Sequence, residues 1–251
     1  MFKATLERIR QKHRTTRYPL EPAVLPDLFR GYPQLDGSRC PDGCRLCGDV
    51  CPTGAIHHAN GLALDMGRCL FCPECQQACP NGAVTFDRDE MLAACEREDL
   101  VVREGEERRL ARAMGQELLA LFGRSFKLRE VSAGGCNACE ADTNVLSTVG
   151  FDLGRFGIQF VASPRHADGM YVTGPVSEHM RIALMKTWEA IPQPKILIAA
   201  GACAINGGPF QGHPEVHDGV DKFLPVDLYI PGCPPHPLTI LDGLLRLLGR
   251  R

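Results

Sequence analysis

The chain has 251 residues, 44% of them hydrophobic and 23% charged, and its formal net charge at pH 7 is -2. This composition is ordinary for a soluble protein of one large or two modest domains, and it argues against nucleic-acid binding, which favours a basic domain. The longest strongly apolar run, residues 196–205, is about half the ~20 residues that a membrane-spanning helix needs, so we expect no transmembrane segment.

Residues 1–34 are expected to form a short basic amphipathic helix followed by a proline-rich extended arm. Phe2, Leu6 and Ile9 recur at helical spacing among lysines and arginines in residues 1–17. Such a helix can rest on a membrane surface or dock on a partner subunit, and the sequence leaves both alternatives open. The same residues carry no apolar core of a secretory signal, so we expect a cytoplasmic protein.

Residues 35–88 hold two tandem runs of four cysteines, and each run ends in Cys-Pro. The second run is the one typical of bacterial ferredoxins, whose fourth cysteine ligates the other cluster in two-cluster proteins. This exchange predicts two 4Fe-4S clusters, one on Cys40, Cys44, Cys47 and Cys79, and the other on Cys51, Cys69, Cys72 and Cys75. The first run departs from the pattern, because three residues separate its first two cysteines where two are usual.

Zinc is the alternative occupant of such cysteine runs, since paired CxxC motifs also build closed tetrahedral sites. The region would then be a structural scaffold without a redox role. Two tandem runs that each end in Cys-Pro favour iron–sulfur clusters over zinc. A reducing compartment disfavours disulfides among the 13 cysteines, and Cys95, which lies outside these groups, is predicted to be a spare thiol.

The rest of the chain is expected to form a linker and an α/β domain. Residues 89–125 are highly charged with apolar residues at helical spacing, which predicts a charged helical linker. In residues 126–251, short apolar runs alternate with helical segments, of which residues 176–191 and the leucine-rich C-terminal residues are the clearest. Strands that alternate with helices are typical of a parallel sheet covered on both faces.

Four more cysteines follow predicted strands of this domain. Cys136 and Cys139 lie on a glycine-rich turn after the first strand, while Cys203 and Cys233 follow the strands at residues 195–200 and 226–230. Because ligands gather beyond the carboxyl ends of parallel strands, we expect these four thiolates to converge on one metal site. Glycines around them let the backbone approach closely and direct N–H groups at sulfur.

Four segments of the second half resemble the small subunit of membrane-bound NiFe hydrogenases of the formate hydrogenlyase type, which is related to the B-type subunit of respiratory complex I. They are residues 134–140, 163–168, 201–203 and 229–235. The resemblance implies a flavodoxin-like fold and one 4Fe-4S cluster, the proximal one, beside a NiFe centre in a separate large subunit. Complex I subunits have adjacent cysteines where this chain has CxxC, which is the hydrogenase form.

Residues 1–88 look like the two-cluster ferredoxin subunit of the same complexes, so two normally separate subunits are joined in this chain. The resemblance implies an electron-transfer subunit of an oxidoreductase, with three 4Fe-4S clusters and no catalytic residue of its own. The implied partners are a NiFe large subunit, membrane-arm subunits, and formate dehydrogenase or another ferredoxin-type donor, on the cytoplasmic side of the inner membrane. The alternative is a complex I-like, quinone-reducing assembly without nickel.

Three further residues are candidates for roles beside the third cluster. Glu140 matches an acidic residue near the large-subunit interface of hydrogenases, which suggests a proton relay, although a carboxylate at a helix N-terminus is an equal alternative. Arg165 and His166 are candidates for contacts with the cluster surroundings or with the partner. For His166, an ordinary hydrogen-bonded structural role is the alternative.

Overall fold

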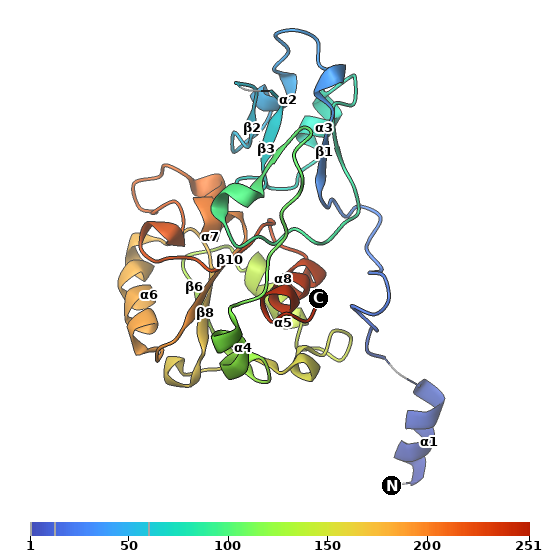
Figure 1. Cartoon of the computed structure of the whole chain (residues 1–251), viewed down its shortest axis with the longest axis vertical. Helices are drawn as coiled ribbons and strands as arrows, with labels where there is room; N and C mark the ends of the chain where they lie inside the picture. Colours follow the sequence, from blue (N-terminus) through green and yellow to red (C-terminus); the bar gives the residue numbers. More distant parts are fainter. Residues whose placement is uncertain (1, 13, 60) are drawn as a thin grey trace.

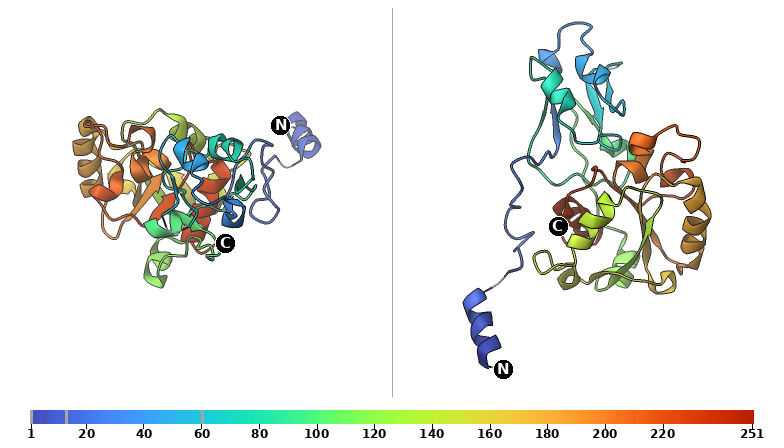
Figure 2. Two further views of the ribbon diagram at one scale, coloured as in Figure 1. Left: turned by 90° about the horizontal axis from the view of Figure 1, so that it is seen from above. Right: turned by 180° about the vertical axis from the view of Figure 1, so that it is seen from behind.

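The computed structural model describes residues 2–12, 14–59 and 61–251. Figure 1 shows a small cysteine-rich module, here called the ferredoxin module, above a larger α/β body. Helix α1 (Phe2–Gln11) stands away from both in all three views of Figures 1 and 2, and none of its residues is buried. The predicted N-terminal helix is therefore present, although it ends at Gln11 rather than Arg17, and the prediction for Met1 falls outside the described residues.

The body is built on a five-stranded sheet in which all neighbouring strands run parallel. Its strands are β6 (Phe126–Ser132), β7 (Ile158–Phe160), β8 (Gly169–Thr173), β9 (Ile196–Ala200) and β10 (Leu228–Ile230). In space they follow the order β10-β9-β8-β6-β7. Numbered along the chain, this is the order 2-1-3-4-5 of flavodoxin-like folds. The predicted α/β class and the flavodoxin-like fold are confirmed.

Helices cover both faces of this sheet. They are α5 (Ala138–Val145), α6 (Glu178–Ala190), α7 (Ala202–Asn206) and α8 (Pro237–Leu247). Strand β9 shows why two faces are needed, because Leu197 and Ala199 pack into the core under α6 while Ile196 and Ile198 pack into the core under α8. Successive side chains of a strand point to opposite faces, so a strand with both faces covered is apolar throughout.

The ferredoxin module contains two similar halves. Strand β1 (Pro33–Leu35) pairs antiparallel with β4 (Val84–Phe86), and β2 (Ile56–His57) pairs with β3 (Ala63–Asp65). The short helices are α2 (Leu46–Asp49) and α3 (Glu74–Ala78). In each half a helix leads into a Cys-Pro-x-Gly-Ala turn and then a strand, and the turn glycines, Gly54 and Gly82, have positive φ. The module is consistent with the predicted ferredoxin-like domain.

Residues 89–125 are helical only in part, which corrects the expected helical linker. They form a 3₁₀ turn (Arg97–Leu100), strand β5 (Val101–Arg103) beside β3, and helix α4 (Gln116–Phe122). Ala94 also forms an antiparallel bridge with Tyr229 at the edge of the main sheet. Open sheet edges present unpaired N–H and C=O groups, and an extended chain satisfies them better than a helix. The segment therefore connects the two sheets instead of lying in solvent.

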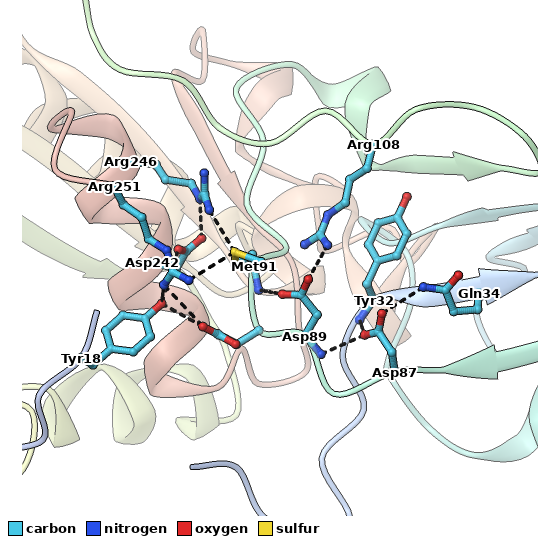
Figure 3. A network of polar contacts seen from close by, with 11 residues as sticks. Tyr18, Tyr32, Gln34, Asp87, Asp89, Met91, Arg108, Asp242, Arg246 and Arg251 are labelled. Atoms are coloured by element: carbon cyan, nitrogen blue, oxygen red, sulfur yellow. Dashed lines mark hydrogen bonds and ion pairs between the residues drawn. The ribbon is translucent and has the colours of Figure 1, made fainter. Parts of the chain in front are cut away.

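A buried polar network joins the N-terminal arm to the body (Figure 3). Tyr18 Oη donates to Glu90 Oε1 at 3.0 Å, and Asp242 in α8 accepts from Arg246 Nε at 2.8 Å. Arg251 bonds to Tyr18 Oη and lies 3.1 Å from Asp242 Oδ1. Burial, followed by Asp242 and Glu90, raises the pKa of Tyr18 and keeps its hydroxyl protonated as a donor. Helix α8 is consequently buried almost all round.

Candidate metal centres

Four cysteines meet at one edge of the main sheet, and we call this set site 3. Cys136 lies in the turn after β6 and Cys139 in the first turn of α5, while Cys203 lies in α7 and Cys233 follows β10. All four line one cavity. The edge is the one at which the parallel strands end, where ligands of such sheets gather. Three loops thus place four thiols together.

Two glycines keep the backbone clear of these thiols. A Cβ on Gly201 would stand 2.7 Å from Cys139 Sγ, and a Cβ on Gly208 would stand 2.8 Å from Cys203 Sγ. Both glycines have positive φ, +89° and +54°, in a region that other residues rarely adopt. The loops around site 3 therefore require glycine both for their conformation and for the room that the sulfur atoms take.

Without a bound cation, the buried thiols of site 3 would be protonated. Burial, followed by the charges of Cys233, Cys136 and Glu140, raises the pKa of Cys203 to about 12. Burial and then Cys203 raise the pKa of Cys139 far above its usual value. Because each thiolate opposes ionisation of the others, a metal group is needed to hold four together. A donor set of thiolates alone, with glycine-lined walls, fits an iron–sulfur cluster.

Glu140 is buried beside Cys139 and lines site 3. Thr173 Oγ1 donates to its Oε1 at 2.6 Å. Burial raises the pKa of this carboxyl, but hydrogen bonds from Ser132 and Thr173 outweigh burial and hold the pKa below its usual value. The carboxylate lies in the first turn of α5, where the helix dipole stabilises a negative charge. A proton-relay role for Glu140 stays a proposal.

Glu130 belongs to no motif, yet it carries the most perturbed carboxyl near site 3. It pairs with Tyr171 across β6 and β8, and its Oε1 is buried with no hydrogen-bond partner among the described residues. Burial and then Glu140 raise its pKa to about 7. One signal marks it in the sequence: the period-two alternation of β6 puts Glu130 on the same face as Phe126 and Leu128.

Arg165 and His166 lie away from site 3. They belong to a 3₁₀ turn (Pro164–His166) between β7 and β8, and both are exposed. Strand β8 begins opposite Leu128, whereas Cys136 follows the far end of β6 at Ser132. The turn before β8 therefore lies toward the opposite edge of the sheet, so the structure does not bring these two residues to the cysteines.

The cysteine set predicted from ligand exchange between the two runs also comes together, and we call it site 2. One cavity is lined by Cys51, Cys69, Cys72 and Cys75. The backbone N–H groups of Ala55 and Phe71 donate to Cys51 Sγ and Cys69 Sγ, each at 3.2 Å. Such hydrogen bonds stabilise charge on sulfur and tune a cluster's potential. Both the grouping and the donors fit a cluster.

Site 1 comprises Cys40, Cys44, Cys47 and Cys79 at the outer end of the module. Burial, then Cys79 and Cys44, raise the pKa of Cys40, and burial, then Cys40 and Cys79, raise that of Cys47. Cys40 thus lies with the set despite its extra spacing residue. Ala83 N donates to Cys79 Sγ at 3.2 Å, as Ala55 does to Cys51 in the other half. The fourth cysteine of each run therefore has the same surroundings.

The three sites form a row, with site 2 in the middle. Burial, Cys72 and Cys51 raise the pKa of Cys75 to about 11, and Cys47 of site 1 adds to the rise. Burial and Cys136 raise the pKa of Cys233, and Cys72 of site 2 adds to it. Figure 1 shows the module above the part of the body that carries α7, beside site 3. Cys95, in contrast, contacts the backbone of Arg112.

Two absences concern the described part of the chain. Across residues 2–12, 14–59 and 61–251, no three His, Cys, Asp or Glu side chains are spaced to hold a single metal ion. No helix within those ranges combines the length and the apolar character needed to cross a membrane.

A protein-family model described as "NADH ubiquinone oxidoreductase, 20 Kd subunit" matches residues 136–247. Formate hydrogenlyase subunit 7 of Escherichia coli is 44% identical over 55% of this chain and 54% of its own length. The probable membrane-bound hydrogenase subunit mbhJ of Pyrococcus furiosus is 39% identical over 58% of this chain and 86% of its own. The chain thus spans about half the length of the Escherichia coli relative.

Relatives also include the B-type subunit of the NADH-quinone oxidoreductase of Desulfovibrio desulfuricans, which is 41% identical over 51% of this chain and 69% of its own length. Among solved structures, a chain of the membrane-bound sulfane sulfur reductase, an archaeal respiratory membrane complex, is 32% identical with a TM-score of 0.47. That match covers 54% of this chain and 75% of the other. The two sequence relatives from hydrogen-linked complexes and the one from a quinone-linked complex all match about half of this chain.

Proposed function

Because the chain belongs to the family of the 20 kDa subunit of NADH:ubiquinone oxidoreductase, we propose that it is an electron-transfer subunit of a membrane-associated oxidoreductase complex. More specifically, we propose a NiFe hydrogenase-type complex in which this chain relays electrons through three 4Fe-4S clusters. The observation that carries the proposal is the row of sites 1, 2 and 3, into which twelve of the 13 cysteines fall.

The clusters would supply one-electron chemistry, and the residues of this chain would hold them and set their potentials. Buried thiols such as Cys69 and Cys203 exclude water from the sulfur atoms. Backbone N–H groups of Ala55, Phe71 and Ala83 donate to sulfur and favour the more negative, reduced state. No residue needs to make or break a substrate bond.

Site 3 is the proposed exit toward a large subunit with a NiFe centre. Cys136 and Cys233 are exposed in the isolated chain, so this face of site 3 is open to a partner. The CxxC spacing of Cys136 and Cys139 is the hydrogenase form, and two of the relatives are named as subunits of hydrogen-linked complexes. A large subunit seated here would bury the cluster and shorten the path for electrons.

The remaining partners would be membrane-arm subunits and an electron donor, such as formate dehydrogenase or another ferredoxin-type protein. The name of the Escherichia coli relative suggests the formate link, and that of the Pyrococcus relative suggests the membrane link. Helix α1 exposes Phe2, Leu6 and Ile9 at 80%, 53% and 69% beside basic residues. This helix supports peripheral attachment, to the membrane surface or to a neighbouring subunit, on the cytoplasmic side of the inner membrane.

A complex I-like assembly that reduces quinone without nickel is the second candidate. It is favoured by relatives named as B-type subunits of NADH-quinone oxidoreductase, which match the same half of the chain at similar identity. The wire of three clusters would be the same, and only its terminus would differ. A zinc-binding scaffold is the third candidate, and it would leave the alignment of the three sites without a purpose.

Metal analysis of the native complex separates the three candidates. The complex is purified anaerobically through a tag on this chain, and iron, sulfide, nickel and zinc are measured per chain. We expect about 12 iron and 12 sulfide from this chain, in addition to nickel from the partner. Iron and sulfide without nickel would favour the quinone-reducing assembly. Zinc without iron or sulfide would contradict every electron-transfer proposal.

A further inference from the structure

His58 lies beside a thiol of site 1. Its Nε2 is 3.6 Å from Cys47 Sγ, within the range of a hydrogen bond to sulfur. The ring is partly buried, and it follows directly on the β2–β3 hairpin, in which Ile56 pairs with Leu64 and His57 with Ala63. The paired backbone immediately before it thus limits where the ring of His58 can lie.

A glycine makes room for this ring. Gly48 follows Cys47 directly, and a Cβ at this position would stand 3.2 Å from His58 Nε2 and 3.4 Å from its Cδ2. A contact of 3.2 Å is tighter than most Cβ contacts, so a side chain at this position would push the ring away from the thiol. The approach of His58 to Cys47 therefore depends on two residues from different elements.

The second half of the module provides an internal comparison. With Cys51-Pro52 aligned on Cys79-Pro80, Cys47 corresponds to Cys75 of site 2, and the equivalents of Gly48 and His58 are Gln76 and Phe86. Phe86 packs against Phe71, with ring centroids 6.2 Å apart. The two halves share their backbone donors to sulfur, but only site 1 has a side-chain nitrogen in this position and a glycine that admits it.

We propose that His58 is a positioning residue for the cluster of site 1, and that its Nε2–H donates a hydrogen bond to Cys47 Sγ. This inference rests on the proposed function, because it assumes that site 1 holds a cluster. A donor to a ligating sulfur stabilises the reduced cluster, which carries the extra electron, more than the oxidised one. His58 therefore raises the reduction potential of site 1 relative to site 2 and favours an electron at the outer end of the row.

The test is a redox titration of the full chain, loaded with clusters under anaerobic conditions and followed by electron paramagnetic resonance at one fixed pH. His58→Phe makes the first half like the second, and we expect the midpoint of site 1 to move to a more negative value while sites 2 and 3 keep theirs. His58→Gln retains an N–H donor and is expected to restore part of the shift. His57→Phe is the matched control, since His57 is exposed and contacts no cysteine in the described structure.

Gly48→Ala provides a second route to the same result without altering the histidine. The added Cβ displaces the ring, so the midpoint of site 1 is expected to shift in the same direction as in His58→Phe. This variant and His58→Gln supply the comparison if His58→Phe loses the cluster of site 1.

The outcomes separate this inference from the proposed function. If the parent chain holds no iron at site 1, the proposed function fails and the inference fails with it. If the parent holds three clusters and the site 1 midpoint is the same in His58→Phe and Gly48→Ala as in the parent, only the role of His58 is overturned. An equal shift in His57→Phe would also overturn it, because the effect would then not depend on the contact with Cys47.

Discussion

The ferredoxin module and the α/β body hold their cysteines in different ways. The module takes its ligands from two short runs between Cys40 and Cys79 and has little regular structure, only short helices and strands. The body collects four thiols from loops that a five-stranded sheet positions, and its core is independent of the metal. Site 3 is thus a feature added to a fold, whereas sites 1 and 2 are a large part of what folds the module.

Removal of iron is expected to have the largest effect and to divide the molecule along this line. In a chain produced without iron, residues 35–88 should lose amide protection, because metal binding there is coupled to folding. The sheet of the body should keep its protection, since its core contains no ligand except at its edge. Hydrogen exchange followed by mass spectrometry measures both regions in one sample. Equal loss of protection in both would contradict the distinction.

Substitution at Gly201 tests the body alone. Gly201→Ala places a Cβ 2.7 Å from Cys139 Sγ in a backbone with φ of +89°, so we expect loss of about four iron atoms per chain, from site 3 only. Gly115→Ala is the control, because Gly115 has a negative φ and open space around its Cα. Iron counts and electron paramagnetic resonance would show whether sites 1 and 2 keep their signals. A loss at those sites would mean that the two regions depend on one another.

An ion pair tests the link between the module and residues 89–125. Asp65 is buried and accepts two hydrogen bonds from Arg97, at 2.8 and 2.7 Å. Asp65→Ala leaves a buried arginine unpaired and is expected to destabilise the folded chain by roughly 3–5 kcal/mol. Asp27→Ala removes the exposed partner of Arg88 and should change stability by less than about 1 kcal/mol. Denaturant unfolding of both variants measures the difference, and equal effects would refute it.

Glu130 gives the smallest effect, and it depends on pH. Its folded-state pKa, about 7, is above the unfolded value, so the folded chain binds more protons between these values and stability falls as pH rises through them. Glu130→Gln should remove this loss and stabilise the body by roughly 1–2 kcal/mol at pH 8, with little change at pH 5. Unfolding curves at both pH values check the sign. A gain of the same size at pH 5 would contradict the titration.

The cysteine pattern predicted more of the candidate sites than of their surroundings. Ligand spacing and strand order suffice to group twelve cysteines, because local spacing and the carboxyl edge of a sheet are properties of the sequence. Arg165 and His166 were expected near site 3, but the short β7 strand places their turn toward the other edge of the sheet. The role of His58 depends on a contact across the module with Cys47 and Gly48, which no local pattern encodes.

The strands and the main helices of the body were also predictable from periodicity. Strand β5 was not, because Val101–Arg103 is extended only where the edge of β3 offers hydrogen bonds. Likewise, α8 has an amphipathic sequence but is buried almost all round, since residues 91–114 cover its outer side. Long-range pairing decides both, and a charged segment such as residues 89–125 gives no sign of it.

The most direct test of the central claim, a row of three clusters with site 2 in the middle, is electron paramagnetic resonance of the fully reduced chain and its cysteine variants. Cys51→Ala and Cys75→Ala, from different cysteine runs, are expected to remove the same signal, and with it the spin–spin broadening of both remaining clusters. If the two variants remove different signals, or if sites 1 and 3 stay coupled without site 2, the proposed row is contradicted.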